Sequence, residues 1–226
     1  MSATVVACPS GRVFVAGGSW EDRKRVRFLK SFRELKPRTK KCEILELSSM
    51  GARRDCIGAV CVPANGPGQG ERIVLVGGRK KISIYSDRAE CFDTTRHRWV
   101  EMDRLNYARK SPAVCCFNGQ FVYVFGGRAN KTATKSESKY VTQFERCEML
   151  PGVSSPWEVL DLQINPDLIY GSLAAVQTKE KTILLIGGKS TTEEGEQLKI
   201  ATQFLPLKGE QGKIKKARQI EIPAHV

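Results

Sequence analysis

Histidine is scarce in this sequence, and no two cysteines stand in a C-x-x-C spacing. The 226 residues include eight cysteines and two histidines, His97 and His225. A zinc site of familiar spacing is therefore not expected. A nucleophilic cysteine would also lack an evident histidine base. We expect no catalytic residue, no metal and no cofactor, so the sequence favours a protein that is not an enzyme.

Long apolar runs are also missing. None approaches the roughly 20 residues that a membrane-crossing helix needs. The apolar patch at Thr4–Ala7 is too short for a secretory signal. Eight cysteines without secretory features are typical of a reducing compartment. The sequence thus predicts no membrane span, free thiols and a cytoplasmic location, with the nucleus as the alternative.

Charge, in contrast, is abundant and mostly of one sign. The formal net charge is +13 and the isoelectric point is about 9.5. Such a field attracts an acidic protein surface, nucleic acid or an anionic surface, and it carries no information about the fold.

A short pattern recurs along the whole chain, and such repeats are typical of repeat architectures. Four segments of β-favouring residues end in a diglycine: VFVAGG, IVLVGG, VYVFGG and ILLIGG. Each follows another short apolar segment across a turn, as in a β-hairpin. A third strand is expected after each diglycine, marked in three repeats by Cys42, Cys91 and Cys147, and then a fourth strand. Four strands per repeat are typical of a propeller blade.

These motifs resemble the kelch-repeat β-propeller family. The second repeat carries a diglycine, Tyr85, Asp93, Trp99 and Arg109, and the third keeps a diglycine and Trp157. The resemblance implies an all-β fold, a kelch-type propeller segment of about four four-stranded blades. It also implies structural roles for these residues: Gly17, Gly18, Gly77, Gly78, Tyr85, Asp93, Trp99, Gly126, Gly127, Trp157, Gly187 and Gly188.

The resemblance covers nearly the whole chain, as one kelch-repeat domain over residues 1–226. Its repeats are approximately 1–50, 51–105, 106–165 and 166–226. Family members usually close a ring of six or seven blades, and here there are four. An incomplete or open propeller, a piece of a longer one, and closure through a second copy stay open. Open blade edges would permit self-association.

Residues 19–41 form a basic insertion after the first diglycine, with ten lysines and arginines. Phe28, Leu29, Phe32 and Leu35 have an amphipathic helical spacing, and Pro37 would end such a helix. The segment is therefore interpreted as a basic loop or a short helix.

Basic residues concentrate in the loops that follow the diglycines and in the loops between repeats. In a blade these loops emerge on one face, and they hold nearly all of the net charge of +13. Arginine pairs carboxylates and phosphates with its planar fork. The candidate partner-binding residues are Arg53, Arg54, Arg79, Arg104, Arg109, Arg128 and Lys131. Arg109 has an alternative role, because it matches the kelch arginine and could bridge blades through backbone carbonyls.

Three function classes stay open at this point. The first is a scaffold or adaptor for protein–protein interaction that docks an acidic partner through its loops. The second is binding of nucleic acid or another anionic surface through the basic face. The lack of an evident aromatic stacking platform argues against nucleic acid. The third, which the resemblance alone implies, is the substrate-holding part of a ubiquitin-ligase adaptor.

Overall fold

The computed structural model is all-β over the residues that it describes, and none of these residues is helical. No helix of the described part has the length and apolar character that crossing a membrane would require. The described residues are 2–22, 25–37, 41–64, 66, 69–130, 140–160, 168–190, 200–204 and 219–221.

The strands form four larger antiparallel sheets in chain order, which we call sheets 1 to 4. Sheet 1 has the order β1-β2-β4-β5 with β3 paired to β2, from β1 (Ser2–Ala7), β2 (Val13–Asp22), β3 (Arg25–Phe28), β4 (Phe32–Pro37) and β5 (Cys42–Glu46). Sheet 2 has the order β6-β7-β10-β11, from β6 (Gly58–Val62), β7 (Arg72–Val76), β10 (Ala89–Asp93) and β11 (Arg98–Glu101).

Sheets 3 and 4 repeat this order. Sheet 3 contains β13 (Ala113–Phe117), β14 (Phe121–Phe125), β16 (Phe144–Leu150), β17 (Val153–Ser154) and β18 (Glu158–Leu160), with β17 and β18 both paired to β16. Sheet 4 contains β19 (Leu168–Gln177), β20 (Ile183–Ser190), β21 (Ile200–Phe204) and β22 (Gln219–Glu221). Two short pairs lie beside them, β8 (Arg79–Lys81) with β9 (Ile84–Tyr85), and β12 (Arg109–Lys110) with β15 (Arg128–Ala129).

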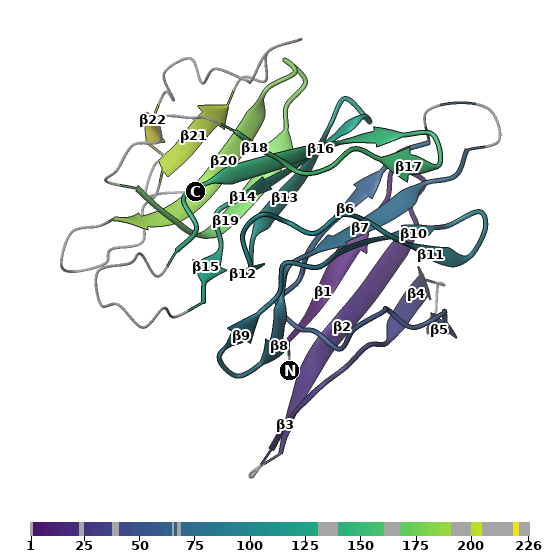
Figure 1. Ribbon diagram of the computed structural model, residues 1–226. Coiled ribbons are helices and arrows are strands. Elements are labelled where there is room, and N and C mark those ends of the chain that lie inside the picture. The colour runs from purple at the N-terminus through teal and green to yellow at the C-terminus, as the bar shows by residue number, and fades with distance from the viewer. Residues whose placement is uncertain are drawn as a thin grey trace.

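Consecutive sheets pack face to face. The first strands lie next to one another, β1 by β6, β6 by β13 and β13 by β19, and the sheets follow one another in chain order through the molecule (Figure 1). Because side chains alternate along a strand, each inner sheet serves two cores. In β7, Ile73 and Leu75 face sheet 1, whereas Val74 and Val76 face sheet 3.

The outer faces of the two end sheets carry the same kind of residue without a covering sheet among the described residues. Val13 and Val15 of β2 hold the register positions of Ile73 and Leu75, and their cross-strand neighbour Val5 is 61% exposed. On sheet 4, Val176 is exposed, and so is Ile186. Both ends of the array are therefore apolar.

The segment after the first diglycine corrects two sequence expectations. It forms β3 and β4 instead of a helix, and β4 is the third strand of sheet 1, so Cys42 lies on the fourth strand. The reason is packing: Phe32 stacks on Phe14 at 5.5 Å between ring centroids and meets Phe92 edge-on at 4.8 Å. A helix would give up the stack within sheet 1 and the contact of Phe32 with sheet 2.

The eight thiols are free. Five of them, in Cys8, Cys61, Cys91, Cys115 and Cys147, are buried between sheets, where cysteine packs as a small apolar residue. Cys42 is exposed, which follows from its place on an outer strand.

Candidate interaction surface

The diglycines and the linkers between sheets meet at one edge of the molecule, which we call the diglycine rim. The amide of Gly18 donates to the carbonyl of Arg54 at 2.9 Å, and the amide of Gly78 donates to that of Arg109, also at 2.9 Å. The strands β3, β8, β9, β12 and β15 lie along this edge (Figure 1). At these two joints the two kinds of loop thus meet on one face, as expected.

Gly77 shows why the diglycines are glycines. Its φ is +65°, a left-handed conformation, and a Cβ there would lie 2.5 Å from the carbonyl oxygen of Arg109. Gly17 has a φ of +57°, and its Cβ would lie 2.3 Å from the carbonyl of Arg54. No other residue accepts both conditions, so the diglycines let each linker approach the preceding sheet.

Arg54 and Arg109 are fully buried, so the expectation that they are exposed partner-binding residues is wrong. The Nη1 of Arg109 donates to the carbonyls of Gly126 at 2.9 Å and Gln143 at 3.1 Å, and its Nη2 pairs with Glu145. This agrees with the alternative role of Arg109 as a bridge through backbone carbonyls. The guanidinium of Arg109 is stable in this buried position because Glu145 and the backbone carbonyls compensate its charge.

Arg54 makes the same arrangement one sheet earlier. It donates to the carbonyls of Gly77 at 2.7 Å and Arg88 at 2.9 Å, and it pairs with Glu90. Burial lowers the pKa of the Arg54 guanidinium, while the charge and hydrogen bond of Glu90 raise it. In each clamp the backbone of the arginine bonds the preceding sheet and its side chain bonds the following one.

A sequence signal for these clamps was available. The arginine precedes its glutamate by 36 residues in both, Arg54 to Glu90 and Arg109 to Glu145. Each arginine also stands four residues before the first strand of its sheet, at Gly58 and Ala113.

Arg79 is also committed to an internal partner. Its Nε and Nη2 donate to the two carboxylate oxygens of buried Asp55 at 2.9 and 2.6 Å. Burial alone would raise the pKa of Asp55, but the hydrogen bonds from Arg79 and Ser19 lower it below its usual value. The guanidinium of Arg79 also lies over the ring of Phe28, 5.3 Å from its centroid.

Three of the predicted arginines are accessible on the rim. Arg53 and Arg128 are exposed, and Arg128 lies over the ring of Tyr140 at 5.7 Å. Arg104 has 58% of its side chain exposed and donates to Asp87 at 2.8 Å. Lys131 lies outside the described residues. The structure thus separates the predicted set into surface cations and internal clamps.

The other motif residues have internal contacts. Trp99 packs against Phe32 and Phe92 and donates its indole N–H to the carbonyl of Ser48 at 2.8 Å. Trp157 packs between sheets 2 and 3 and donates its indole N–H to the carbonyl of Asp103 at 2.9 Å. Each tryptophan therefore fills the space between its own sheet and the preceding one, as predicted.

Tyr85 lies in β9, beside sheet 2, and Asp93 ends β10 of sheet 2. Tyr85 is on the rim, where its amide donates a hydrogen bond to the Oδ1 of Asn130 at 2.7 Å and its ring lies under Lys110 at 5.2 Å. Asp93 accepts the amides of Thr95 and Arg96, both at 2.9 Å, and so shapes the turn between β10 and β11. Gly187 and Gly188 lie inside β20.

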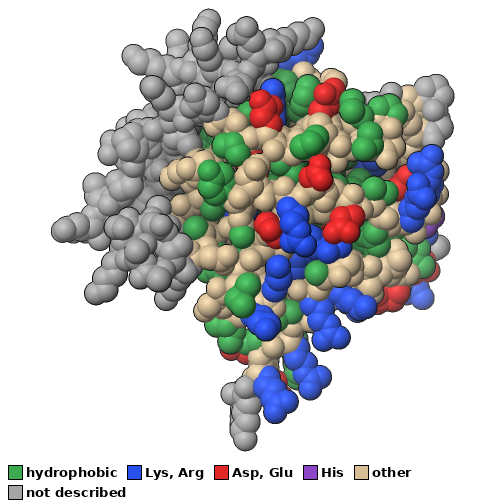
Figure 2. All heavy atoms as spheres, viewed as in Figure 1, with side chains coloured by type: hydrophobic (Ala, Val, Ile, Leu, Met, Phe, Trp, Pro, Cys, Tyr) green, Lys and Arg blue, Asp and Glu red, His purple; other side chains and the backbone are tan. Residues whose placement is uncertain are grey.

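The sequence prediction missed the apolar side chains of the rim. Ile82 lies in the β8–β9 turn and Ile84 follows the turn, and they are 68% and 47% exposed. Trp20 is also exposed, and Arg27 lies over its ring at 6.0 Å. Figure 2 shows Lys and Arg side chains gathered toward the lower part of this face. The rim accordingly combines cations, aromatic rings and exposed aliphatic groups.

A cavity of about 600 Å³ lies at a different place, between sheets 2 and 3. Its walls include Arg72, Arg98, Glu101, Met102 and Met149. Arg72 bridges the two sheets there, donating to the carbonyls of Leu150 at 2.8 Å and Met149 at 3.2 Å. Of the predicted site residues described here, Asp93 alone lines this cavity.

Comparison with known proteins gives information on the fold. No family model matches the chain, and no curated protein matches it. The chain is similar in fold to YjhT. The solved structure of YjhT superposes with a TM-score of 0.65 at 14% identity, over 96% of this chain and 72% of that chain. At such low identity the likeness to YjhT concerns the arrangement of strands and not the chemistry of the rim.

Proposed function

We propose that the protein is a non-catalytic interaction scaffold, a kelch-type β-propeller segment whose diglycine rim docks an acidic protein partner. The observation that carries the proposal is the composition of the rim, where surface cations stand beside exposed aliphatic and aromatic side chains. We place the protein in the cytoplasm or nucleus, where its free thiols stay reduced.

Support for a propeller segment comes from the repeated joints. Four successive antiparallel sheets share one strand order, and tryptophan and diglycine hold equivalent positions in sheets 2 and 3. The Arg54 and Arg109 clamps fix neighbouring sheets to each other. A rigid frame with variable loops is a common support for binding surfaces.

Support for an acidic protein partner comes from the mixture of groups. Arg53, Arg128 and Lys81 are exposed on the rim and attract carboxylates. Ile82 and Ile84 offer apolar contact area beside them. Interfaces between proteins combine an apolar centre with a charged surround, and an aliphatic side chain does not supply the stacking that single-stranded nucleic acid uses.

Nucleic-acid binding is the second candidate, and one observation favours it. Trp20 is exposed with Arg27 over its ring, and a base can stack on such a pair. The prediction from sequence lacked an aromatic platform, and the structure offers the exposed ring of Trp20 on the rim hairpin β2–β3.

Matched charge reversals test the proposal. One variant carries Arg53→Glu and Arg128→Glu on the rim, and the control carries Arg98→Glu and Lys179→Glu at the other edge, so that both lose the same net charge. Partners are captured from cell extract at moderate salt after nuclease treatment and quantified by mass spectrometry. Exposed swaps should change the free energy of unfolding by under about 0.5 kcal/mol.

We expect the rim variant to lose the captured protein and the control to retain it. Equal loss from both variants would mean a diffuse effect of net charge and would contradict docking on the rim. A partner that disappears after nuclease treatment of the wild-type sample would favour the second candidate. Ile82→Ser with Ile84→Ser should weaken capture even at high salt, because apolar contact is not screened.

A further inference from the structure

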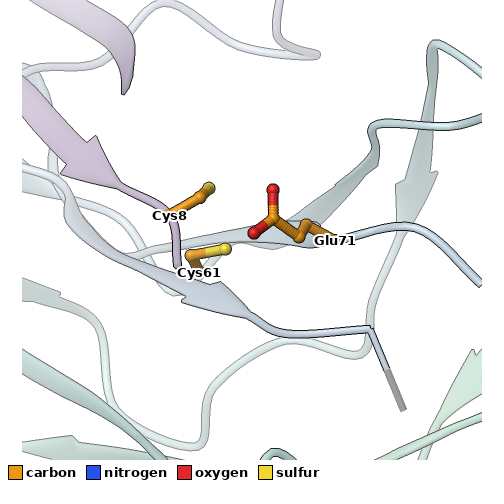
Figure 3. Close-up of side chains that lie close together, drawn as sticks. All are labelled: Cys8, Cys61 and Glu71. Atoms are coloured by element: carbon orange, nitrogen blue, oxygen red, sulfur yellow. The ribbon is translucent and has the colours of Figure 1, made fainter. Parts of the chain in front are cut away.

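Three potential metal ligands converge at the edge of the molecule opposite the diglycine rim. Cys8 follows β1, Cys61 lies in β6, and Glu71 directly precedes β7. Their two sulfur atoms and one carboxylate oxygen all lie within 4.8 Å of one another. Figure 3 shows both sulfurs and the carboxylate directed toward a common space. The packing of sheet 1 on sheet 2 thus brings together groups that are far apart in the chain.

Glu71 is held in place by partners on both its ends. Its carboxylate accepts the amide of Ser10 at 2.9 Å and the hydroxyl of Ser10 at 2.5 Å. Its backbone carbonyl accepts the hydroxyl of Thr94 at 2.7 Å. Ligating carboxylates in metal sites are typically oriented by such hydrogen bonds. Each oxygen keeps a lone pair, because Ser10 uses one position on each.

The nearby guanidinium of Arg12 is paired with a different carboxylate, that of Glu34. Arg12 donates to both carboxylate oxygens of Glu34 at 2.9 and 3.0 Å.

The thiols of Cys8 and Cys61 are buried. The hydrogen bond with Cys8 and then burial raise the pKa of the Cys61 thiol far above its usual value.

We propose that Cys8, Cys61 and Glu71 bind one divalent cation of the zinc class, with a fourth position left to water. Two thiolates select borderline and soft metals over magnesium or calcium, and three protein ligands with an open position suit zinc. On binding, two S–H bonds break, two metal–sulfur bonds form, and both protons pass to the solvent without any change of redox state.

The proposed ion would join sheet 1 to sheet 2. The Arg54 clamp holds these sheets at the diglycine rim, and the cysteine–glutamate site lies at the other edge. At the same edge Arg72 joins sheets 2 and 3, and Asn118 joins sheets 3 and 4 through a 2.7 Å bond from its amide to Gln177. Metal binding would add stability to the native state by mass action.

Titration with zinc and cobalt(II) of the reduced, chelator-treated full chain tests this proposal. We expect one ion per chain, thiolate-to-cobalt charge-transfer absorbance, proton release on binding, and a rise of the thermal midpoint with zinc. X-ray absorption of the zinc-loaded wild type should show two sulfur neighbours at about 2.3 Å. That measurement needs no variant, so it stands if a substitution prevents folding.

The variants identify the ligands. Cys8→Ser with Cys61→Ser should abolish the charge-transfer band, and Ser10→Ala should weaken zinc about tenfold or more by releasing Glu71. The matched control is Cys91→Ser with Cys147→Ser, two buried thiols between sheets 2 and 3. A band that survives in the Cys8/Cys61 variant, an equal loss in the control, or no sulfur neighbours in the wild type would overturn the proposal. The outcome is independent of whether the rim binds a partner.

Discussion

At the scale of single residues, two buried arginines carry much of the organisation of the rim. Arg54 and Arg109 each satisfy two backbone carbonyls and one glutamate in the next sheet. The carbonyls of Gly77 and Gly126 are thereby bonded inside the protein, where an unpaired carbonyl would be unfavourable. We therefore expect these residues to act on stability, whereas the proposed docking uses the surface arginines.

Removing one clamp arginine should be strongly destabilising. We expect Arg109→Ala to lower the free energy of unfolding by about 3–5 kcal/mol, because Glu145 would be left buried without a counter-charge. Urea denaturation at neutral pH measures the change. Arg104→Ala is the matched control, and its exposed pair with Asp87 should contribute no more than about 1 kcal/mol. Similar losses from both variants would contradict the clamp.

We expect the protein to lose stability in acid, because the hydrogen bonds of Asp55 favour its ionised carboxylate. Its folded-state pKa is lowered, so its contribution is present above the unfolded value of about 3.9 and is lost as the pH falls through the folded value. We expect the thermal midpoint to fall below about pH 4. Asp55→Asn should be less stable at neutral pH and should lose less on acidification. Parallel curves for the two proteins would exclude this assignment.

At the scale of strands and turns, the diglycines set how closely a linker approaches the sheet before it. Gly77→Ala combines a left-handed backbone with a Cβ placed 2.5 Å from a backbone oxygen. Gly152 has a similar φ of +77° but nothing within 4 Å of its Cβ position. Comparing alanine variants at these two glycines therefore separates the cost of the left-handed backbone from the cost of the steric overlap.

We expect Gly152→Ala to reduce the free energy of unfolding by about 1–2 kcal/mol from the left-handed conformation alone. Gly77→Ala should lose clearly more, because Arg109 and its linker must move. Chemical denaturation of the two variants gives the difference. Equal losses would show that the close contact has no energetic weight.

How far the sequence could predict these elements depends on how local their causes are. The strands before each diglycine were predictable, because β-favouring residues and a turn glycine act locally. The stripe of Phe28, Leu29, Phe32 and Leu35 was not, since its spacing suits a helix and the decisive contact of Phe32 is with Phe14 and Phe92. Tertiary packing outweighs local preference in such a case.

The residues of the candidate site also differ in how far the sequence could predict their roles. Exposed Arg53 and Arg128 follow from loop position, and the bridging role of Arg109 was open from its motif. Burial of Arg54 depends on Glu90, and the pairing is evident only once the same 36-residue spacing is seen between Arg109 and Glu145. The Cys8–Cys61–Glu71 cluster likewise requires the packing of sheet 1 on sheet 2.

At the scale of the whole molecule, the array has two apolar end faces. Val5 on sheet 1 and Val176 on sheet 4 are exposed at positions whose equivalents in the inner sheets face a neighbouring sheet. An inner interface of this type excludes water from apolar side chains on both sides. The end faces are thus suited to pack against a second copy of the chain.

We expect reversible self-association that increases with protein concentration, measured by sedimentation velocity. Val5→Lys with Val176→Lys should shift the protein toward the monomer, because a buried lysine opposes face-to-face packing. Ile82→Lys on the diglycine rim is the control and should leave the association unchanged. A protein that stays monomeric at all concentrations would refute this prediction.

The direction of the clamps has a consequence for synthesis of the chain. Arg54 is translated 36 residues before Glu90, and Arg109 the same number before Glu145. Sheet 1 and its linker can fold while the guanidinium of Arg54 is still solvated and waiting for the next sheet. Sheets 2 and 3 would then each find a charged anchor already held by the preceding sheet, which favours assembly of these two joints from the N-terminus toward the C-terminus.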